Sequence, residues 1–140
     1  MKSIAQLTAG TIALALLAAP ALAQEAKTAV PPKFDSKGIA RTETVRRAFD
    51  SQREAIQVRV DFAPGASFPK HSHPGVEIAY VLSGTIEYEM DGKTIRLQAG
   101  ESLYIPAGAV HSAKNIGNDV ISELATYVVE KNQPIVILAK

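Results

Sequence analysis

From Ala55 onward, short runs of alternating apolar and polar residues are interrupted by turn signals. Apolar side chains occupy every second position from Ile56 to Phe62, the period of two expected for a half-buried strand. Short strands between regularly spaced turns are typical of sandwiches and barrels, and no long helical pattern competes, so the sequence predicts an all-β fold. The turn signals recur about every eight to ten residues, at Pro64-Gly65, Pro74-Gly75, Ser83-Gly84, Asp91-Gly92, Ala99-Gly100, Pro106 to Gly108 and Gly117 to Asp119.

One hairpin can be predicted residue by residue. Asp91-Gly92 favours a two-residue type I′ turn. One face of this hairpin is then apolar and the other carries an opposite-charge pair, which places Glu87 and Glu89 on the outer face rather than in a general-base role. The turn sets a register that pairs Met90 with Lys93, Glu89 with Thr94, Tyr88 with Ile95, Glu87 with Arg96, and Ile86 with Leu97.

Residues 1–23 have the features of an export signal. Lys2 supplies a positive start, a continuous apolar run ends at Pro20, and Ala21-Leu22-Ala23 forms a cleavage site. The alternative is an uncleaved membrane anchor, but polar residues dilute the segment. The sequence therefore predicts cleavage after Ala23, a periplasmic or secreted location, and a mature chain that is not held in a membrane.

Beyond the signal, the chain divides into an arm and a domain. Residues 24–37 contain Pro31-Pro32 and are rich in Ala, Pro and Lys, and residues 24–50 are predicted to form an extended arm or linker. Within this arm, Arg41 to Asp50 weakly favours a helical turn, and a strand is the open alternative. Residues 51–140 are predicted to form the barrel domain.

Charge and cysteine content exclude several classes of function. The net charge is +1, from 15 basic and 14 acidic side chains, and Lys2 is the one charge in residues 1–23, so the mature chain is neutral. A neutral chain without a basic cluster argues against nucleic-acid binding, which depends on phosphate neutralisation. The absence of cysteine excludes disulfides, thiolate metal sites and cysteine nucleophiles.

The chemistry is concentrated in the three histidines, His71, His73 and His111. His71 and His73 are two apart and point the same way on one strand. Glu77 opens the next apolar run, where a carboxylate needs a partner, and a closed barrel can bring His111 to the same interior point. Three imidazoles and one carboxylate suit one divalent transition metal, Zn, Fe, Mn, Ni or Cu, with open coordination positions.

The residues around these ligands resemble the two motifs of the cupin superfamily. The first is Gly65-x5-His71-x-His73-x3-Glu77-x6-Gly84, and the second is Gly100-x5-Pro106-x-Gly108-x2-His111-x3-Asn115. The resemblance implies a small antiparallel jelly-roll barrel like that of single-domain bacterial cupins. It also implies that His71, His73, Glu77 and His111 are the metal ligands, that the motif glycines occupy turns, and that Asn115 closes a turn.

The resemblance leaves the reaction open, because one fold supports many activities. The first hypothesis is a metal-dependent enzyme acting on a small organic molecule, with dioxygenase or lyase/isomerase chemistry. The second is a non-catalytic module that binds a sugar or a carboxylate and holds a structural metal, and the third is a barrel that the metal only stabilises. The aromatic residues that could line the cavity are Phe62, Phe68, Tyr88, Tyr104 and Tyr127.

Two surface features bear on partners. Arg46-Arg47 is a basic pair that is expected to be solvated rather than to bind a carboxylate. Ile78, Tyr80 and Leu82 alternate with Glu77 and face outward if Glu77 faces the cavity. Three large apolar side chains need cover, which the arm or a second subunit could supply, and the sequence predicts a homodimer.

Overall fold

The computed structural model describes residues 31–140, and over this range the chain forms ten β-strands and no α-helix. Within the same range, no helix is long and apolar enough to cross a membrane. The predicted signal segment, residues 1–23, lies outside the described residues. The strands are β1 (Ile39–Ala48), β2 (Arg53–Phe62), β3 (Ser67–Ser72), β4 (Val76–Ser83), β5 (Thr85–Met90), β6 (Lys93–Gln98), β7 (Ser102–Ile105), β8 (His111–Asn115), β9 (Ile121–Glu130) and β10 (Ile137–Leu138).

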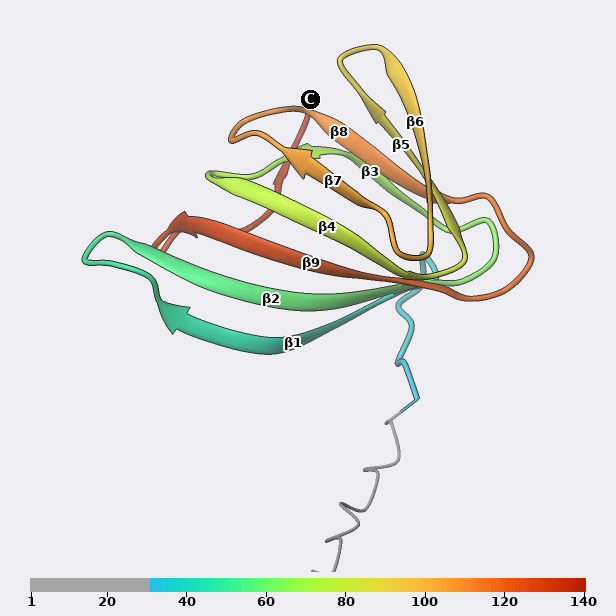
Figure 1. The fold of residues 1–140 in the computed structure, drawn as a ribbon, viewed down its shortest axis with the longest axis horizontal. Coiled ribbons are helices and arrows are strands. Elements are labelled where there is room, and N and C mark those ends of the chain that lie inside the picture. The colour runs from blue at the N-terminus through green and yellow to red at the C-terminus, as the bar shows by residue number, and fades with distance from the viewer. Residues whose placement is uncertain (1–30) are drawn as a thin grey trace, which may run out of the picture.

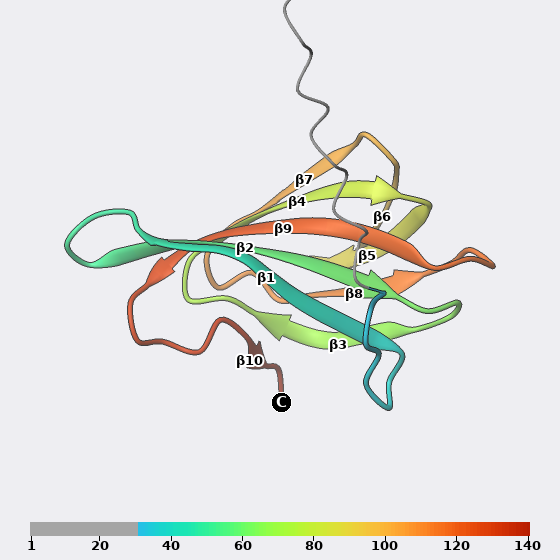
Figure 2. The same ribbon diagram turned by 90° about the horizontal axis from the view of Figure 1, so that it is seen from below.

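The strands make two antiparallel sheets of five strands each, which face one another (Figures 1 and 2). One sheet has the order β1-β2-β9-β4-β7, and the other has the order β10-β3-β8-β5-β6. Apart from the hairpins β1–β2 and β5–β6, neighbouring strands come from distant parts of the chain. This arrangement confirms the jelly roll predicted from the sequence. The largest fully buried apolar side chains between the sheets are Tyr88, Tyr127, Phe62, Ile56, Ile86, Ile105 and Ile121.

The predicted hairpin is confirmed in every pair. β5 and β6 pair from Thr85 opposite Gln98 to Met90 opposite Lys93. Asp91 and Gly92 both have positive φ, 52° and 71°, as a type I′ turn requires. The hairpin therefore buries Tyr88 and leaves the side chains on its other face to solvent.

The segment beginning at Arg41 is a strand, so the weakly favoured helical turn was wrong. β1 pairs with β2 along its length, from Ile39 opposite Phe62 to Ala48 opposite Glu54. Residues 41–48 are exposed on both faces, so burial imposes no alternation on their sequence, and pairing with β2 decides their conformation. The sheet thus begins at Ile39, inside the segment predicted as an arm.

Asn115 holds the loop before β9 to the end of β2. Its side-chain amide donates hydrogen bonds to the carbonyls of Phe62, Ala63 and Asp119, and its Oδ1 accepts one from the amide of Gly117. This buried network confirms that Asn115 closes a turn.

The motif glycines occupy positions that favour glycine. Gly65, Gly84, Gly100 and Gly108 all have positive φ, between 72° and 94°. Gly84 is the most constrained, because a Cβ there would lie 2.2 Å from Cγ2 of Ile121. The expectation that these glycines serve as turn or close-approach positions is confirmed.

The outer face of β4 carries an apolar row. Ile78, Tyr80 and Leu82 have exposed fractions of 46%, 42% and 43%, while Ala79 and Val81 between them are fully buried. β1 is separated from β4 by β2 and β9, and the row on β4 stays exposed. Cover by the described part of the arm is therefore excluded.

Candidate metal centre

The structure brings His71, His73, His111 and Glu77 together inside the barrel. His71 in β3 lies opposite His111, the first residue of the neighbouring β8, and His73 follows the end of β3. One ring nitrogen of each histidine lies within 4.8 Å of the others. Glu77 reaches them from β4 in the other sheet, with its Oε2 2.8 Å from His73 Nε2 and 3.4 Å from His111 Nε2. All four predicted residues are buried.

Each of these histidines is oriented by a backbone carbonyl. A carbonyl oxygen only accepts, so a ring nitrogen beside it carries the proton, and the other nitrogen has a free lone pair. The proton is thereby fixed on Nδ1 and the lone pair on Nε2, the arrangement of imidazoles that bind metals. The Nδ1 atoms donate to the carbonyls of Pro69 (from His71, 2.8 Å), Ile135 (from His73, 2.5 Å) and Ala109 (from His111, 3.0 Å).

The two polar atoms that lie closest together in the cluster have no hydrogen-bond partner among the described residues. Nε2 of His73 and Oε2 of Glu77 are both buried, and neither has a hydrogen-bond partner of suitable geometry among residues 31–140. With the proton of His73 on Nδ1, both atoms are acceptors, and they face each other at 2.8 Å. Two buried acceptors this close need a cation or an added proton between them. Three imidazole nitrogens and a carboxylate therefore fit a divalent transition metal.

The pKa shifts in the cluster follow from burial and mutual contact. Burial raises the pKa of Glu77, but its close contacts with His111 and His73 outweigh burial and lower the pKa to about 2. Burial, followed by the charge of His111, lowers the pKa of His71 to about 4. Burial lowers the pKa of His111, but its contact with the Glu77 carboxylate outweighs burial and raises the pKa. At neutral pH, Glu77 is ionised and His71 is neutral, the states that metal binding requires.

His71, Glu77 and His111 line a cavity between the two sheets. Its centre has room for about one water molecule, so side chains of the cavity wall must shift to admit a ligand as large as an organic acid. Of the predicted wall residues, Tyr104 is placed elsewhere: it is 58% exposed on β7 because its alternation points it away from the core. The other four predicted aromatic residues line the cavity, namely Phe62, Phe68, Tyr88 and Tyr127.

Sequence reasoning missed a second carboxyl group in this cavity. Glu123 lies on β9, is only 5% exposed, and accepts a short hydrogen bond from the hydroxyl of Tyr88. The signal was present, because Glu123 occupies an inward position of β9 between Ile121 and Ala125. Glu77 was predicted as a site residue because a carboxylate within an apolar strand needs a partner, and the same argument applies to Glu123.

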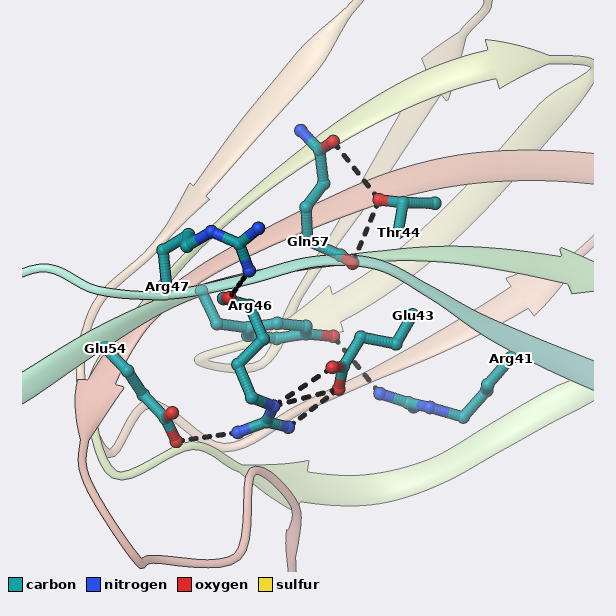
Figure 3. Close-up of polar contacts among 8 residues, drawn as sticks. Arg41, Glu43, Thr44, Arg46, Arg47, Glu54 and Gln57 are labelled. Carbon is teal, nitrogen blue, oxygen red and sulfur yellow. Dashed lines mark hydrogen bonds and ion pairs between the residues drawn. The ribbon is translucent and has the colours of Figure 1, made fainter.

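Sequence reasoning also missed Arg41, which lines the cavity from β1. Figure 3 shows the contrast with Arg46 on the same strand, which is held between Glu43 and Glu54 at 2.7 Å from each. Arg41 contacts the Tyr127 hydroxyl at 3.5 Å, and no carboxylate among the described residues pairs with it. Its guanidinium is therefore available to an anion entering the cavity. Arg46 is neutralised at the surface, as expected.

Comparison with known proteins places this site in a family. A family model described as a Cupin domain matches residues 58–128. The chain is 38% identical over 77 residues to germin-like protein subfamily 2 member 2 of Arabidopsis thaliana, covering 49% of this chain and 34% of that protein. It is 34% identical over 71 residues to the oxalate-binding protein of Thermotoga maritima, covering 50% of this chain and 59% of that protein. The chain thus spans between a third and three-fifths of the length of these two relatives.

Solved structures share the fold. A protein of Klebsiella pneumoniae with a double-stranded β-helix domain superposes with a TM-score of 0.62 at 22% identity, over 78% of this chain and 91% of its own. A recombinant oxalate oxidase in complex with glycolate gives a TM-score of 0.59 at 24% identity, over 74% of this chain and 56% of its own. The family model spans half of the chain and contains all four residues of the cluster, so this chain belongs to the cupin family.

Proposed function

We propose that the chain is an exported, metal-dependent cupin that binds a small organic acid and acts on it. The observation that carries the proposal is the buried cluster, in which the Nε2 atom of His73 and a carboxylate oxygen of Glu77 converge with no proton of their own between them. Such a set is organised for a cation rather than for the stability of the fold, because unpaired buried acceptors are costly.

The bound metal would supply Lewis-acid chemistry, or redox chemistry in a dioxygenase, within a water-poor cavity. His71, His73, Glu77 and His111 would hold it, and Zn, Fe, Mn, Ni and Cu all suit this donor set. If the chain is metallated after export, raw affinity favours Cu or Zn. The apolar and aromatic part of the cavity wall, which includes Phe62, Phe68 and Tyr127, would exclude bulk water from the ligand.

Arg41 supports a carboxylate as the ligand. Its guanidinium lines the cavity without an acidic partner among the described residues, and its Cζ lies 5.5 Å from the centroid of the Phe68 ring. A planar guanidinium binds a carboxylate through two parallel hydrogen bonds. The name of the Thermotoga maritima relative, an oxalate-binding protein, adds support and makes oxalate the first probe.

The second candidate is a non-catalytic module that binds its small molecule and holds a structural metal. The small size of the cavity favours it, because little room remains for a reacting substrate. Turnover separates the two candidates. Lyase and isomerase assays, and oxygen-consumption assays, would show product in the first case and unchanged ligand in the second.

The proposed function is tested first by the metal content of protein purified from its native compartment without an affinity column. Azide and oxalate are then titrated into copper- or cobalt-substituted protein, and we expect both to change the metal spectrum. The His111→Ala variant should lose this response, and the surface variant Glu87→Gln should keep it. An unchanged spectrum in fully metallated protein would mean that the ion has no open coordination position. That result would support a barrel that the metal only stabilises.

Export and assembly are parts of the proposal that need their own tests. The intact mass of the exported protein should match residues 24–140, and a full-length mass in the membrane fraction would contradict export. We infer a homodimer that covers Ile78, Tyr80 and Leu82. Light scattering should give twice the monomer mass, and Tyr80→Glu should give monomers. Only monomer in the unaltered protein at micromolar concentration would contradict the dimer.

A further inference from the structure

A carboxyl group and a phenol bridge the two sheets inside the cavity. Glu123 comes from β9 of one sheet and Tyr88 from β5 of the other, and the Tyr88 hydroxyl donates a short hydrogen bond to Glu123 Oε2. Both side chains are buried, and both line the cavity that His71, Glu77 and His111 line. Glu123 and Tyr88 therefore line the same cavity as the metal cluster but are not members of that cluster.

Glu123 has no cation of its own. Among the described residues, no lysine, arginine or histidine lies within 4.0 Å of its carboxyl oxygens. A buried carboxylate without such a partner is costly, so Glu123 keeps its proton to a higher pH than an exposed carboxyl group does. Tyr88 is placed as the donor of their hydrogen bond, which leaves the remaining oxygen of Glu123 for a ligand.

The groups facing Glu123 act in opposite directions. Burial, and then the negative charge of Glu77 on β4, raise the pKa of Glu123 to about 7, although the hydrogen bond from Tyr88 and the charges of Arg41 and His111 oppose them. Burial, and then the charge of Glu123, raise the pKa of Tyr88 far above its usual value, so the phenol keeps its proton. The pair thus contains one readily exchanged proton, on the carboxyl group.

We infer that Glu123 is the proton-transfer residue of this cavity, that Tyr88 is its positioning residue, and that together they serve a small organic anion bound beside the metal cluster. This inference deepens the proposed function and rests on it. When the proton passes to the anion, the O–H bond of Glu123 breaks, its electron pair stays on the carboxylate, and the Tyr88 hydroxyl stabilises that charge. In the reverse direction the carboxylate takes a proton from the ligand, and the ligand keeps the electron pair.

The test counts protons rather than turnover. Oxalate, and separately azide, are titrated calorimetrically into cobalt-loaded protein at pH 7 in two buffers of different ionisation enthalpy. An anion beside Glu123 raises its proton affinity, so the unaltered protein should take up a measurable fraction of one proton per anion bound. Glu123→Gln keeps an oxygen that accepts a hydrogen bond from Tyr88 but has no carboxyl proton. Its proton uptake per bound anion should therefore fall by that fraction.

Two further variants test whether the proton uptake depends on a carboxyl group at the position of Glu123 and on its hydrogen bond from Tyr88. Glu87→Gln removes a carboxyl one residue from Tyr88 but on the outer face, and its proton count should equal that of the unaltered protein. Tyr88→Phe should still bind the anions with a smaller uptake, because Glu123 without its donor is already more protonated at pH 7. If Glu123→Gln does not fold, Tyr88→Phe decides alone, and an unchanged count in it contradicts the inference.

The outcomes distinguish the two proposals. Binding with an equal proton count in Glu123→Gln overturns this inference and leaves the proposed function intact. A tenfold or greater loss of cobalt affinity in Glu123→Gln also overturns it, because Glu123 would then be a metal ligand. If neither anion binds the loaded protein, the proposed function fails and this inference fails with it.

Discussion

The outer and inner faces of the barrel both carry charged side chains, but the charges are neutralised differently on the two faces. On the outer face, Glu87 pairs with Arg96 and Glu89 pairs with Lys70, each at 2.8 Å in contact with solvent. Such exposed pairs contribute roughly 0–1 kcal/mol each to folding. The charges outside therefore serve solubility and register, and the fold depends little on any one of them.

On the inner face, the carboxyl groups have no lysine or arginine partner among the described residues. Glu77 and Glu123 are 3% and 5% exposed, and Arg41 at the cavity wall contacts a phenol instead of a carboxylate. Burying an ionised carboxyl group without a cation costs several kcal/mol, so Glu77 needs a cation and Glu123 favours its protonated form. The comparison teaches that the interior is arranged around charges that the chain does not itself supply.

The largest expected effect comes from breaking the inner cluster. His111→Ala should lower metal affinity tenfold or more, because the site has no spare ligand. Combining it with His71→Ala should add less than the sum of the two single losses, since both dismantle one site. Competition with a chromogenic chelator measures the affinity, with Glu87→Gln as the matched surface control. Full affinity in His111→Ala would show that the four residues do not act together.

The next effect is a pH-dependent change in stability at Glu123. Its folded pKa of about 7 lies above the ordinary value of 4.5, so the folded state binds the extra proton and stability falls as pH rises through this window. Glu123→Gln should therefore be more stable than the unaltered metal-free protein at pH 8, by on the order of 1–3 kcal/mol, with the difference shrinking towards pH 5. Urea unfolding at both pH values measures it. A difference independent of pH would contradict the buried-carboxyl argument.

A smaller effect compares two arginines of β1. Arg41→Met should weaken oxalate binding to the metal-loaded protein by about tenfold, because one charge-assisted contact is lost. Arg46→Met should leave oxalate binding unchanged, because its guanidinium is already held by Glu43 and Glu54. Calorimetric titration measures both. Equal losses in the two variants would mean that the surface potential, rather than the cavity, attracts the anion.

The smallest effect belongs to the outer face. Glu89→Gln breaks the exposed pair with Lys70 and should change the free energy of unfolding by less than about 0.5 kcal/mol. Raised salt should reduce even this difference. Urea unfolding at low and high salt measures it. A loss as large as that expected at Glu123 would remove the distinction between the two faces.

Local sequence patterns predicted the barrel and four of its inward polar residues, because their neighbours carried the information. The β5–β6 register followed from one turn, and Glu77 stood out within an apolar strand next to two histidines. Glu123 has the same kind of strand position but no nearby motif, so it was missed. Arg41 could not be found, because β1 is exposed and only its pairing with β2 brings Arg41 to the cavity.

The contact between His73 and the carbonyl of Ile135 has a consequence for the order of events during synthesis. The two residues are 62 positions apart, and β10 pairs with β3 beside His71 just beyond this contact. Until residue 135 has emerged from the ribosome, the ring of His73 lacks the carbonyl that fixes its proton. A nascent chain therefore offers an incoming ion an incompletely oriented set of ligands. The complete and oriented set of ligands is therefore expected only after Ile135 and β10 have joined β3.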